Sequence, residues 1–95
     1  TALGIITIDE QPFNVIAYPN PSKEVVYLNI TSHTTENVQI VMYDVTGNKV
    51  KTIFSGELIE SETRFTISRG NLSNGVYLIQ TISENGMDTQ RIVLE

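Results

Sequence analysis

The stretch VYLIQTISENGMDTQRIVL, residues 76–94, carries the strongest fold signal in this chain of 95 residues. Its first part, Val76–Ser83, is rich in β-branched and aromatic residues, and Asn85-Gly86 separates it from Asp88–Leu94. Asn-Gly is favoured in a type I′ turn because both central residues of that turn need positive φ. We therefore predict an antiparallel hairpin with Asn85 and Gly86 at its turn.

Earlier strands are predicted from alternating or β-branched runs that polar turns separate. In the clearest of them, Val26, Leu28 and Ile30 fall on one face, as in a half-buried antiparallel strand. The polar run Ser55–Ser61 is expected to cross between two sheets. The predicted strands before the hairpin are Phe13–Tyr18, Glu24–Thr31, Asn37–Asp44, Lys49–Phe54 and Glu62–Ser68.

The turns are indicated by residue type. Pro19-Asn20-Pro21 ends the first strand, since each proline fixes φ and pushes the residue before it toward extended geometry. Gly47 can supply the positive φ that a type I turn with a G1 bulge requires, and we expect Asp44 to cap that turn. Leu72, the one apolar residue of the turn before Gly75, is expected to close one end of the core.

The composition indicates a single all-β domain. Val and Ile together number 21 and Thr adds 11, whereas Ala, the best helix former, occurs twice. Seven short strands without a helical segment between them predict an antiparallel β-sandwich, immunoglobulin-like with Greek-key crossings. Residues 13–95 are assigned to this domain, and residues 1–12 to a linker with one weak strand at Leu3–Ile8.

Charge and residue content exclude several classes of partner. The net charge of −5 has the wrong sign for a surface that binds nucleic acid. The chain contains no Cys, and its apolar runs, such as Ile40–Tyr43, are far too short to span a bilayer. Because the chain opens at Thr1 without Met or a basic segment, we expect it to be a piece of a longer protein.

The sequence assigns no catalytic, metal-binding or cofactor-binding residue. His33 is the single histidine, and no Cys or second His could complete a zinc site or a nucleophile-base pair with it. The carboxylate pairs Glu60/Glu62 and Asp9/Glu10 are interpreted as solvated loop residues, because catalytic carboxylates need an apolar pocket. A hydrolase is therefore disfavoured.

Five short motifs follow one another along the chain, and together they resemble a known family. In this order and spacing they are similar to the C-terminal sorting domain of type IX secretion, also called Por secretion, from about Phe13 to Glu95. The motifs are Tyr18-Pro19-Asn20-Pro21, Val26-Tyr27-Leu28, Met42-Tyr43-Asp44 with Gly47 and Val50, Leu72-Ser73-Asn74-Gly75-Val76-Tyr77, and Arg91-Ile92-Val93-Leu94.

The resemblance implies a non-catalytic address at the end of a secreted protein. It implies a cargo domain on the same chain, transit through the periplasm, and delivery across a Gram-negative outer membrane to the cell surface or the medium. The implied partners are the type IX translocon, an outer-membrane barrel shuttle and a cysteine sortase that cuts before Phe13. The implied signal-motif residues are Pro19, Asn20, Pro21, Asp44, Gly47, Gly75 and Tyr77.

The last five residues, Arg91–Glu95, are the segment that we expect the translocon to recognise. In this segment Ile92 and Leu94 share one face, while Arg91 and Val93 share the other. A terminal strand at a sheet edge can accept a strand from a partner. In the alternative interpretation Ile92 and Leu94 only complete the core. An alternative function for the fold as a whole is a carbohydrate-binding or adhesive module of a secreted protein.

Overall fold

The computed structural model describes residues 12–95, which form seven strands and no helix. The strand predicted at Leu3–Ile8 and the other linker residues before Pro12 lie outside the described residues. The strands are β1 (Phe13–Tyr18), β2 (Val25–Ser32), β3 (Glu36–Asp44), β4 (Lys49–Leu58), β5 (Glu62–Ser68), β6 (Gly75–Ser83) and β7 (Gly86–Leu94).

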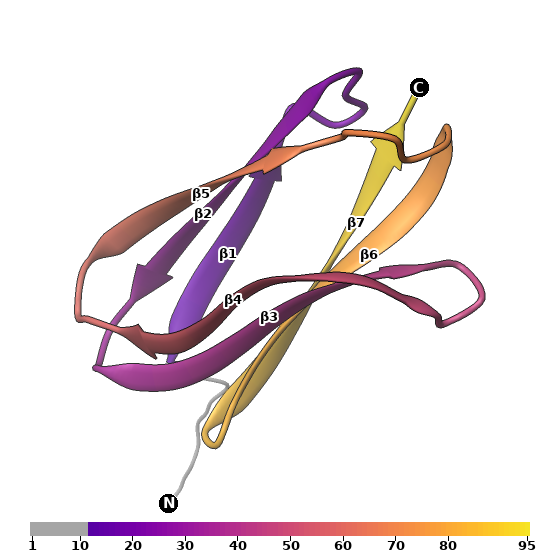
Figure 1. Cartoon of the computed structure of the whole chain (residues 1–95). Helices are drawn as coiled ribbons and strands as arrows, with labels where there is room; N and C mark the ends of the chain where they lie inside the picture. The colour runs from indigo at the N-terminus through magenta and orange to yellow at the C-terminus, as the bar shows by residue number, and fades with distance from the viewer. Residues whose placement is uncertain (1–11) are drawn as a thin grey trace, which may run out of the picture.

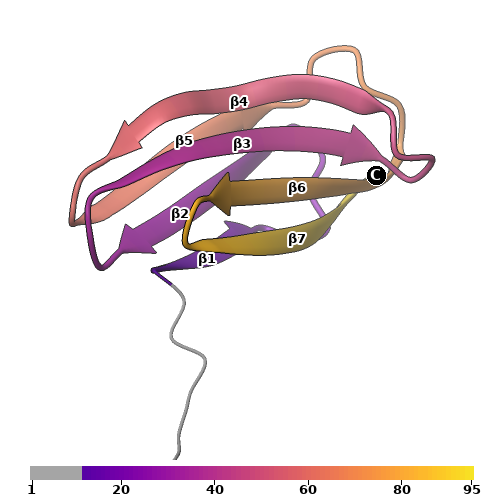
Figure 2. The same cartoon turned by 90° about the horizontal axis from the view of Figure 1, so that it is seen from below.

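The strands form two antiparallel sheets that pack face to face, which confirms the predicted β-sandwich. One sheet has the order β1-β2-β5 and the other the order β4-β3-β6-β7. The chain changes sheet between β2 and β3, between β4 and β5, and between β5 and β6. Figure 2 shows the four-stranded sheet in front of the three-stranded one, with β1 beside β7.

The core lies between the sheets and follows the alternation of the strands. Val26, Leu28 and Ile30 of β2 are buried, as predicted, and β3 is confirmed as a central strand between β4 and β6. Full burial of one aliphatic side chain contributes about 1.5–3 kcal/mol. The buried core residues are Phe13, Val26, Leu28, Ile30, Val38, Ile40, Met42, Leu58, Ile67, Tyr77, Ile79, Ile92 and Leu94.

Strand β4 is longer than predicted. The sequence predicts that this strand ends at Phe54, but it pairs with β3 as far as Leu58, so the crossing to β5 is only residues 59–61. Leu58 is buried. The ring of Phe54 packs closely over Gly56, where a Cβ atom would lie only 3.3 Å from it. Pairing with β3 and burial of Leu58 therefore outweigh the weak β propensity of residues 55–57. The predicted change of sheet at this crossing is confirmed.

The terminal hairpin is confirmed, but its turn lies one residue earlier than predicted. Ser83 pairs with Gly86, so the two-residue loop consists of Glu84 and Asn85 rather than Asn85 and Gly86. In this register Tyr77 pairs with Ile92, and both side chains point into the core. Figure 1 shows that this hairpin turn lies at the end of the sandwich where β1 begins, whereas the C-terminus lies at the opposite end.

Candidate recognition site

The C-terminal part of β7 is built into the core on one face only. Ile92 is 0% exposed and Leu94 is 3% exposed, and both belong to the core cluster. Because strand side chains alternate, Arg91, Val93 and Glu95 point away from the core. The burial of Ile92 and Leu94 in the core, which the alternative interpretation expects, is therefore confirmed.

The outer edge of this part of β7 is already occupied, although β7 is the edge strand of its sheet. Asn20 Nδ2 donates to the carbonyl of Arg91 at 2.9 Å, and the amide of Val93 donates to Asn20 Oδ1 at 3.0 Å. The Ser22 amide donates to the Val93 carbonyl at 2.9 Å, and the Glu95 amide donates to the Ser22 carbonyl at 2.9 Å. The expectation that this segment offers a free edge to a partner strand is therefore wrong, because the β1–β2 loop already satisfies those groups.

The β1–β2 loop explains why the Pro19-Asn20-Pro21 motif bears on the C-terminus. The Tyr18-Pro19 and Asn20-Pro21 peptide bonds are both cis. After the second proline, Ser22 is buried, and its hydroxyl donates to the Val25 carbonyl. The motif thus carries the Asn20 side chain and the Ser22 main chain to the edge of β7.

Arg69, in the loop between β5 and β6, ties this end of the domain together. Its Nε donates to the Leu72 carbonyl at 2.9 Å, and its Nη1 donates to the Lys23 carbonyl at 2.9 Å and to a main-chain oxygen of Glu95 at 2.8 Å. Its Nη2 donates to Asn74 Oδ1. A planar guanidinium can hold several acceptors at once, so one side chain links two loops to the C-terminus.

Asp44 and Gly47 form the turn between β3 and β4 as predicted. The Gly47 amide donates to the Asp44 carbonyl at 3.0 Å, and Gly47 has a φ of +90°. Asp44 Oδ1 accepts from the Thr46 hydroxyl at 2.6 Å and from the amides of Thr46 and Asn48 at 3.0 Å each. These bonds, from Thr46 first, hold the pKa of Asp44 below its ordinary value. Both residues therefore act in the turn.

Gly75 and Tyr77 are placed opposite the end of β7. Gly75 has a φ of +153° and pairs with Leu94, while Tyr77 pairs with Ile92. Tyr77 is 7% exposed, and its hydroxyl donates to the Ser73 carbonyl at 2.8 Å. The buried ring and its bonded hydroxyl are similar to the tyrosine corner of immunoglobulin-like sandwiches. Leu72 packs against the core at this end, as predicted.

The other end of β7 is held by a carboxylate. Glu36, buried at the start of β3, accepts from the Thr34 hydroxyl at 2.7 Å and from Asn85 Nδ2 at 3.2 Å. The hydrogen bond from Thr34 is the largest of several that lower the pKa of Glu36, while burial opposes it. Glu36 therefore links β3 to the turn of the β6–β7 hairpin.

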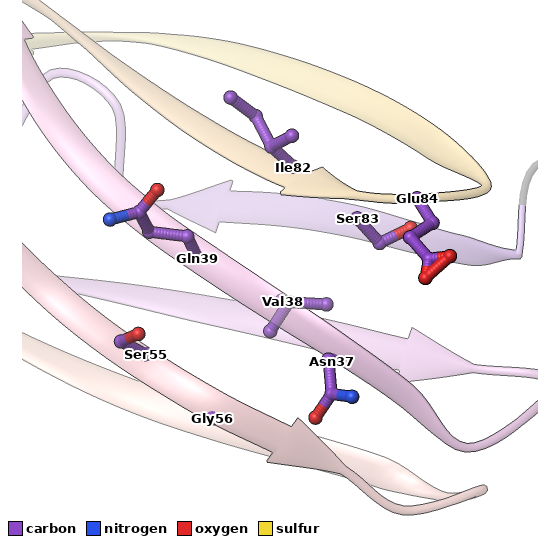
Figure 3. A pocket seen from close by; sticks show the side chains of 8 residues that line it. All are labelled: Asn37, Val38, Gln39, Ser55, Gly56, Ile82, Ser83 and Glu84. Carbon is purple, nitrogen blue, oxygen red and sulfur yellow. The ribbon is translucent and has the colours of Figure 1, made fainter.

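A shallow hollow of about 580 Å³ lies near this end, on the outer face of the four-stranded sheet. Figure 3 shows that Asn37, Gln39 and Ser55 line it from β3 and β4, with Ile82 and Glu84 on the side of the hairpin. Its lining consists of amides, hydroxyls, aliphatic groups and a single carboxylate. This set contains neither His nor Cys, the side chains that most often act as a catalytic base or as a thiol nucleophile.

The candidate ionisable residues that the structure describes are exposed. His33 is exposed, with Nε2 3.3 Å from Asn14 Nδ2, and Glu60 and Glu62 are exposed. Asp9 and Glu10 lie outside the described residues. Within residues 12–95, no group of three or more His, Cys, Asp or Glu side chains could hold a metal ion. No helix in this part of the chain is long and apolar enough to cross a membrane.

Together, these observations define a small β-sandwich whose distinctive feature is a closed C-terminal end. The family model described as the secretion system C-terminal sorting domain, Por secretion tail, matches residues 16–95, and the chain belongs to this family. Comparisons with curated proteins and with solved structures gave no match. The domain is a C-terminal sorting signal of type IX secretion, and its family is one of signals rather than enzymes.

Membership also sets what accompanies the domain. A sorting signal implies a cargo protein that the type IX secretion system handles, and export of that cargo to the cell surface or the medium. Three contacts of this site, those of Ser22, Arg69 and Glu36, are not predicted by any sequence pattern. Glu95, which bonds to both Ser22 and Arg69, is 73 residues from Ser22 and 26 residues from Arg69. Asn85, which bonds to Glu36, is 49 residues from it. No local pattern marks such pairs.

Proposed function

We propose that this domain is the address that takes its cargo from the periplasm across the outer membrane, and that the translocon and its barrel shuttle recognise it at Arg91–Glu95 and the adjoining loops. The observation that supports this proposal is the closed C-terminal end. Ile92 and Leu94 complete the core, while Asn20, Ser22 and Arg69 bind the main chain beside them. A chain without its last residues lacks both this core packing and these main-chain bonds, so the closed C-terminal end forms only when the domain is complete.

The experiment that tests this proposal is a fusion of residues 1–95 behind a fluorescent protein with a signal peptide, in a host that has type IX secretion. Fluorescence should appear on the cell surface or in the medium. Deletion of residues 91–95 should leave the reporter in the periplasm, and its unchanged delivery would contradict the proposal. The double variant Arg91→Ala, Glu95→Ala keeps Ile92 and Leu94, so it separates recognition from folding.

The proposed cut by a surface cysteine sortase falls within residues 1–12. β1 begins at Phe13, so a cut in this range frees the cargo and leaves all seven described strands intact. N-terminal sequencing of the domain recovered from the medium should then give a first residue at or before Phe13. A first residue inside β1, or a cargo that stays joined to the domain at the cell surface, would contradict this step.

A second candidate function, glycan binding, is favoured by one surface. On the outer face of the three-stranded sheet, the rings of Tyr18 and Tyr27 have centroids 5.7 Å apart, and the Arg64 guanidinium carbon lies 5.1 Å from the Tyr27 centroid. A tyrosine ring can stack against the apolar face of a sugar while its hydroxyl forms a hydrogen bond. Retardation of the domain, but not of its Tyr27→Ala variant, in gels that contain a neutral polysaccharide would support this function.

A further inference from the structure

The terminal strand can be contacted at its backbone edge or at one of its two faces. The inner face, with Ile92 and Leu94, is buried in the core. The edge at Arg91, Val93 and Glu95 is occupied by Asn20 and Ser22. In the folded domain, the outer face with the side chains of Arg91 and Val93 is therefore the accessible part of this strand.

Strand register places these two side chains within a larger surface. Arg91 pairs with Leu78, Leu78 pairs with Tyr43, and Tyr43 pairs with Lys49, so these residues form one row across the four-stranded sheet. Val93 and Val76 form the next row. Figure 2 shows the four strands of this sheet side by side. We call the following six residues the outer patch: Tyr43, Lys49, Val76, Leu78, Arg91 and Val93.

The outer patch has an apolar centre with a cation on either side. Its four uncharged side chains are half-buried, and Lys49 and Arg91 are exposed. Val41 lies on the same face next to Tyr43 and is 4% exposed, yet it is not part of the core cluster. A partly exposed apolar surface with charges at its rim has the composition of a protein-binding site. Glu95 directly follows β7, and it is the acidic residue nearest to Val93 in the sequence.

Most of the acidic residues that the structure describes lie away from the outer patch, and only Glu24, Asp44 and Glu95 lie at its end of the sandwich, so the charge favours one orientation of an acidic partner. Six acidic residues lie toward the opposite end of the sandwich, where β1 begins. They repel a negatively charged surface, while Lys49 and Arg91 attract it, and such asymmetry steers association. The six residues are Glu36, Glu57, Glu60, Glu62, Glu84 and Asp88.

We infer that the export machinery binds this domain on the outer patch, through a protein surface with an apolar centre bordered by carboxylates. The inference rests on the proposed function. A second copy of the domain is disfavoured as the occupant, because an isologous contact would bring Lys49 and Arg91 against like charges.

The first test compares the delivery of two matched double variants in the reporter fusion. Arg91→Glu, Val93→Thr alters the outer patch, and Arg64→Glu, Ile16→Thr makes the same kinds of change on the outer face of the other sheet. Surface fluorescence should fall at least about tenfold for the first variant and stay within about twofold for the second. Thermal unfolding of both purified domains verifies that they fold. A folded outer-patch variant with unchanged delivery would overturn the inference but not the proposed function.

The second test identifies the occupant by photo-crosslinking in cells. Tyr43 is replaced by p-benzoylphenylalanine in one fusion, and Tyr27, on the opposite outer face, in the other. A crosslink from position 43 to an outer-membrane protein, absent from position 27, supports the inference when the first test also shows loss of delivery. Crosslinking to a second copy of the domain or to lipid overturns it. If the wild-type fusion itself is not delivered, the proposed function fails, and the inference fails with it.

Discussion

The two halves of β7 differ in what they contribute to the fold. The inward side chains of the first half are Asp88 and Gln90, which pair with Thr81 and Ile79 and bond to each other at 3.0 Å. The inward side chains of the second half are Ile92 and Leu94, which are buried in the core. The strand is therefore polar where it begins and apolar where it ends, so its last residues supply most of its packing energy.

The edges of the two halves differ in the same direction. Asn20 and Ser22 bind the outward backbone groups of the second half. Among the contacts of residues 12–95, no such backbone bond reaches Met87 or Thr89 in the first half. Packing and edge bonds thus coincide in the final residues, so a chain that stops short loses both contributions at once. For a signal that lies at the end of a protein, this arrangement makes folding depend on completeness.

The largest expected effect comes from removing apolar packing in the second half. Leu94→Ala should lower the free energy of unfolding by about 2–4 kcal/mol, because it leaves a cavity in the core. Gln90→Ala, in the first half, should lower it by only about 0.5 kcal/mol. Urea unfolding of both variants measures the contrast. Equal losses would show that the two halves contribute alike.

Next in size is the effect of losing the hydrogen bonds of the Arg69 guanidinium. Arg69→Lys keeps the charge but cannot hold the oxygens of Leu72, Lys23, Glu95 and Asn74 together, so we expect a loss of about 1–2 kcal/mol. Urea unfolding gives the loss, and amide exchange shows whether it is greatest near Glu95. A variant as stable as the wild type would mean that these hydrogen bonds add nothing to the closed end.

Opening the edge of the second half should have a smaller effect. Asn20→Ala removes the bonds to the Arg91 carbonyl and the Val93 amide, at a cost of about 0.5–1 kcal/mol. Hydrogen exchange should accelerate at the Val93 amide, whereas the Glu95 amide, which bonds to Ser22, should change little. Exchange at Val93 that stays as slow as in the wild type would show that the edge remains closed without Asn20.

The smallest effect concerns pH and acts on the first half. The pKa of Glu36 is lower in the folded domain than in the unfolded chain, so the unfolded chain binds more protons as pH falls. The stability that Glu36 contributes is complete above the ordinary pKa that it has in the unfolded chain, and it is lost as pH falls through the lowered pKa of the folded domain. Asn85 resonances should shift over this range, because the Asn85 side chain bonds to the Glu36 carboxylate.

The variant Glu36→Gln provides the control for this prediction. It removes the titrating group that bonds to the hairpin turn from β3, so stability should fall less steeply with acid than in the wild type. Asp44, whose pKa is also lowered, remains and keeps part of the pH dependence. A curve for Glu36→Gln that superimposes on the wild-type curve would rule out a role for this carboxylate.

Alternation identified which side chains of β2, β3 and β7 face the core, because period-two patterning is a local property. It could not locate the turn of the last hairpin. Moving the turn from Asn85-Gly86 to Glu84-Asn85 changes the partner of Ile92 from Ile79 to Tyr77, and both registers leave Ile92 facing inward. The bond from Asn85 to Glu36, far away in the sequence, accompanies the observed register.

The sequence by itself determined the strands, their inward faces, the Gly47 turn and the family, because each depends on residues close together in the chain or on the order of short motifs. Only the tertiary structure decided that β4 continues to Leu58, that the edge of Arg91–Glu95 is closed, and that Arg91 lies in one row with Leu78 and Tyr43. These features depend on pairing between distant segments. A backbone amide or carbonyl bonds alike to any partner brought within reach, so side-chain patterns do not reveal which distant segment it meets.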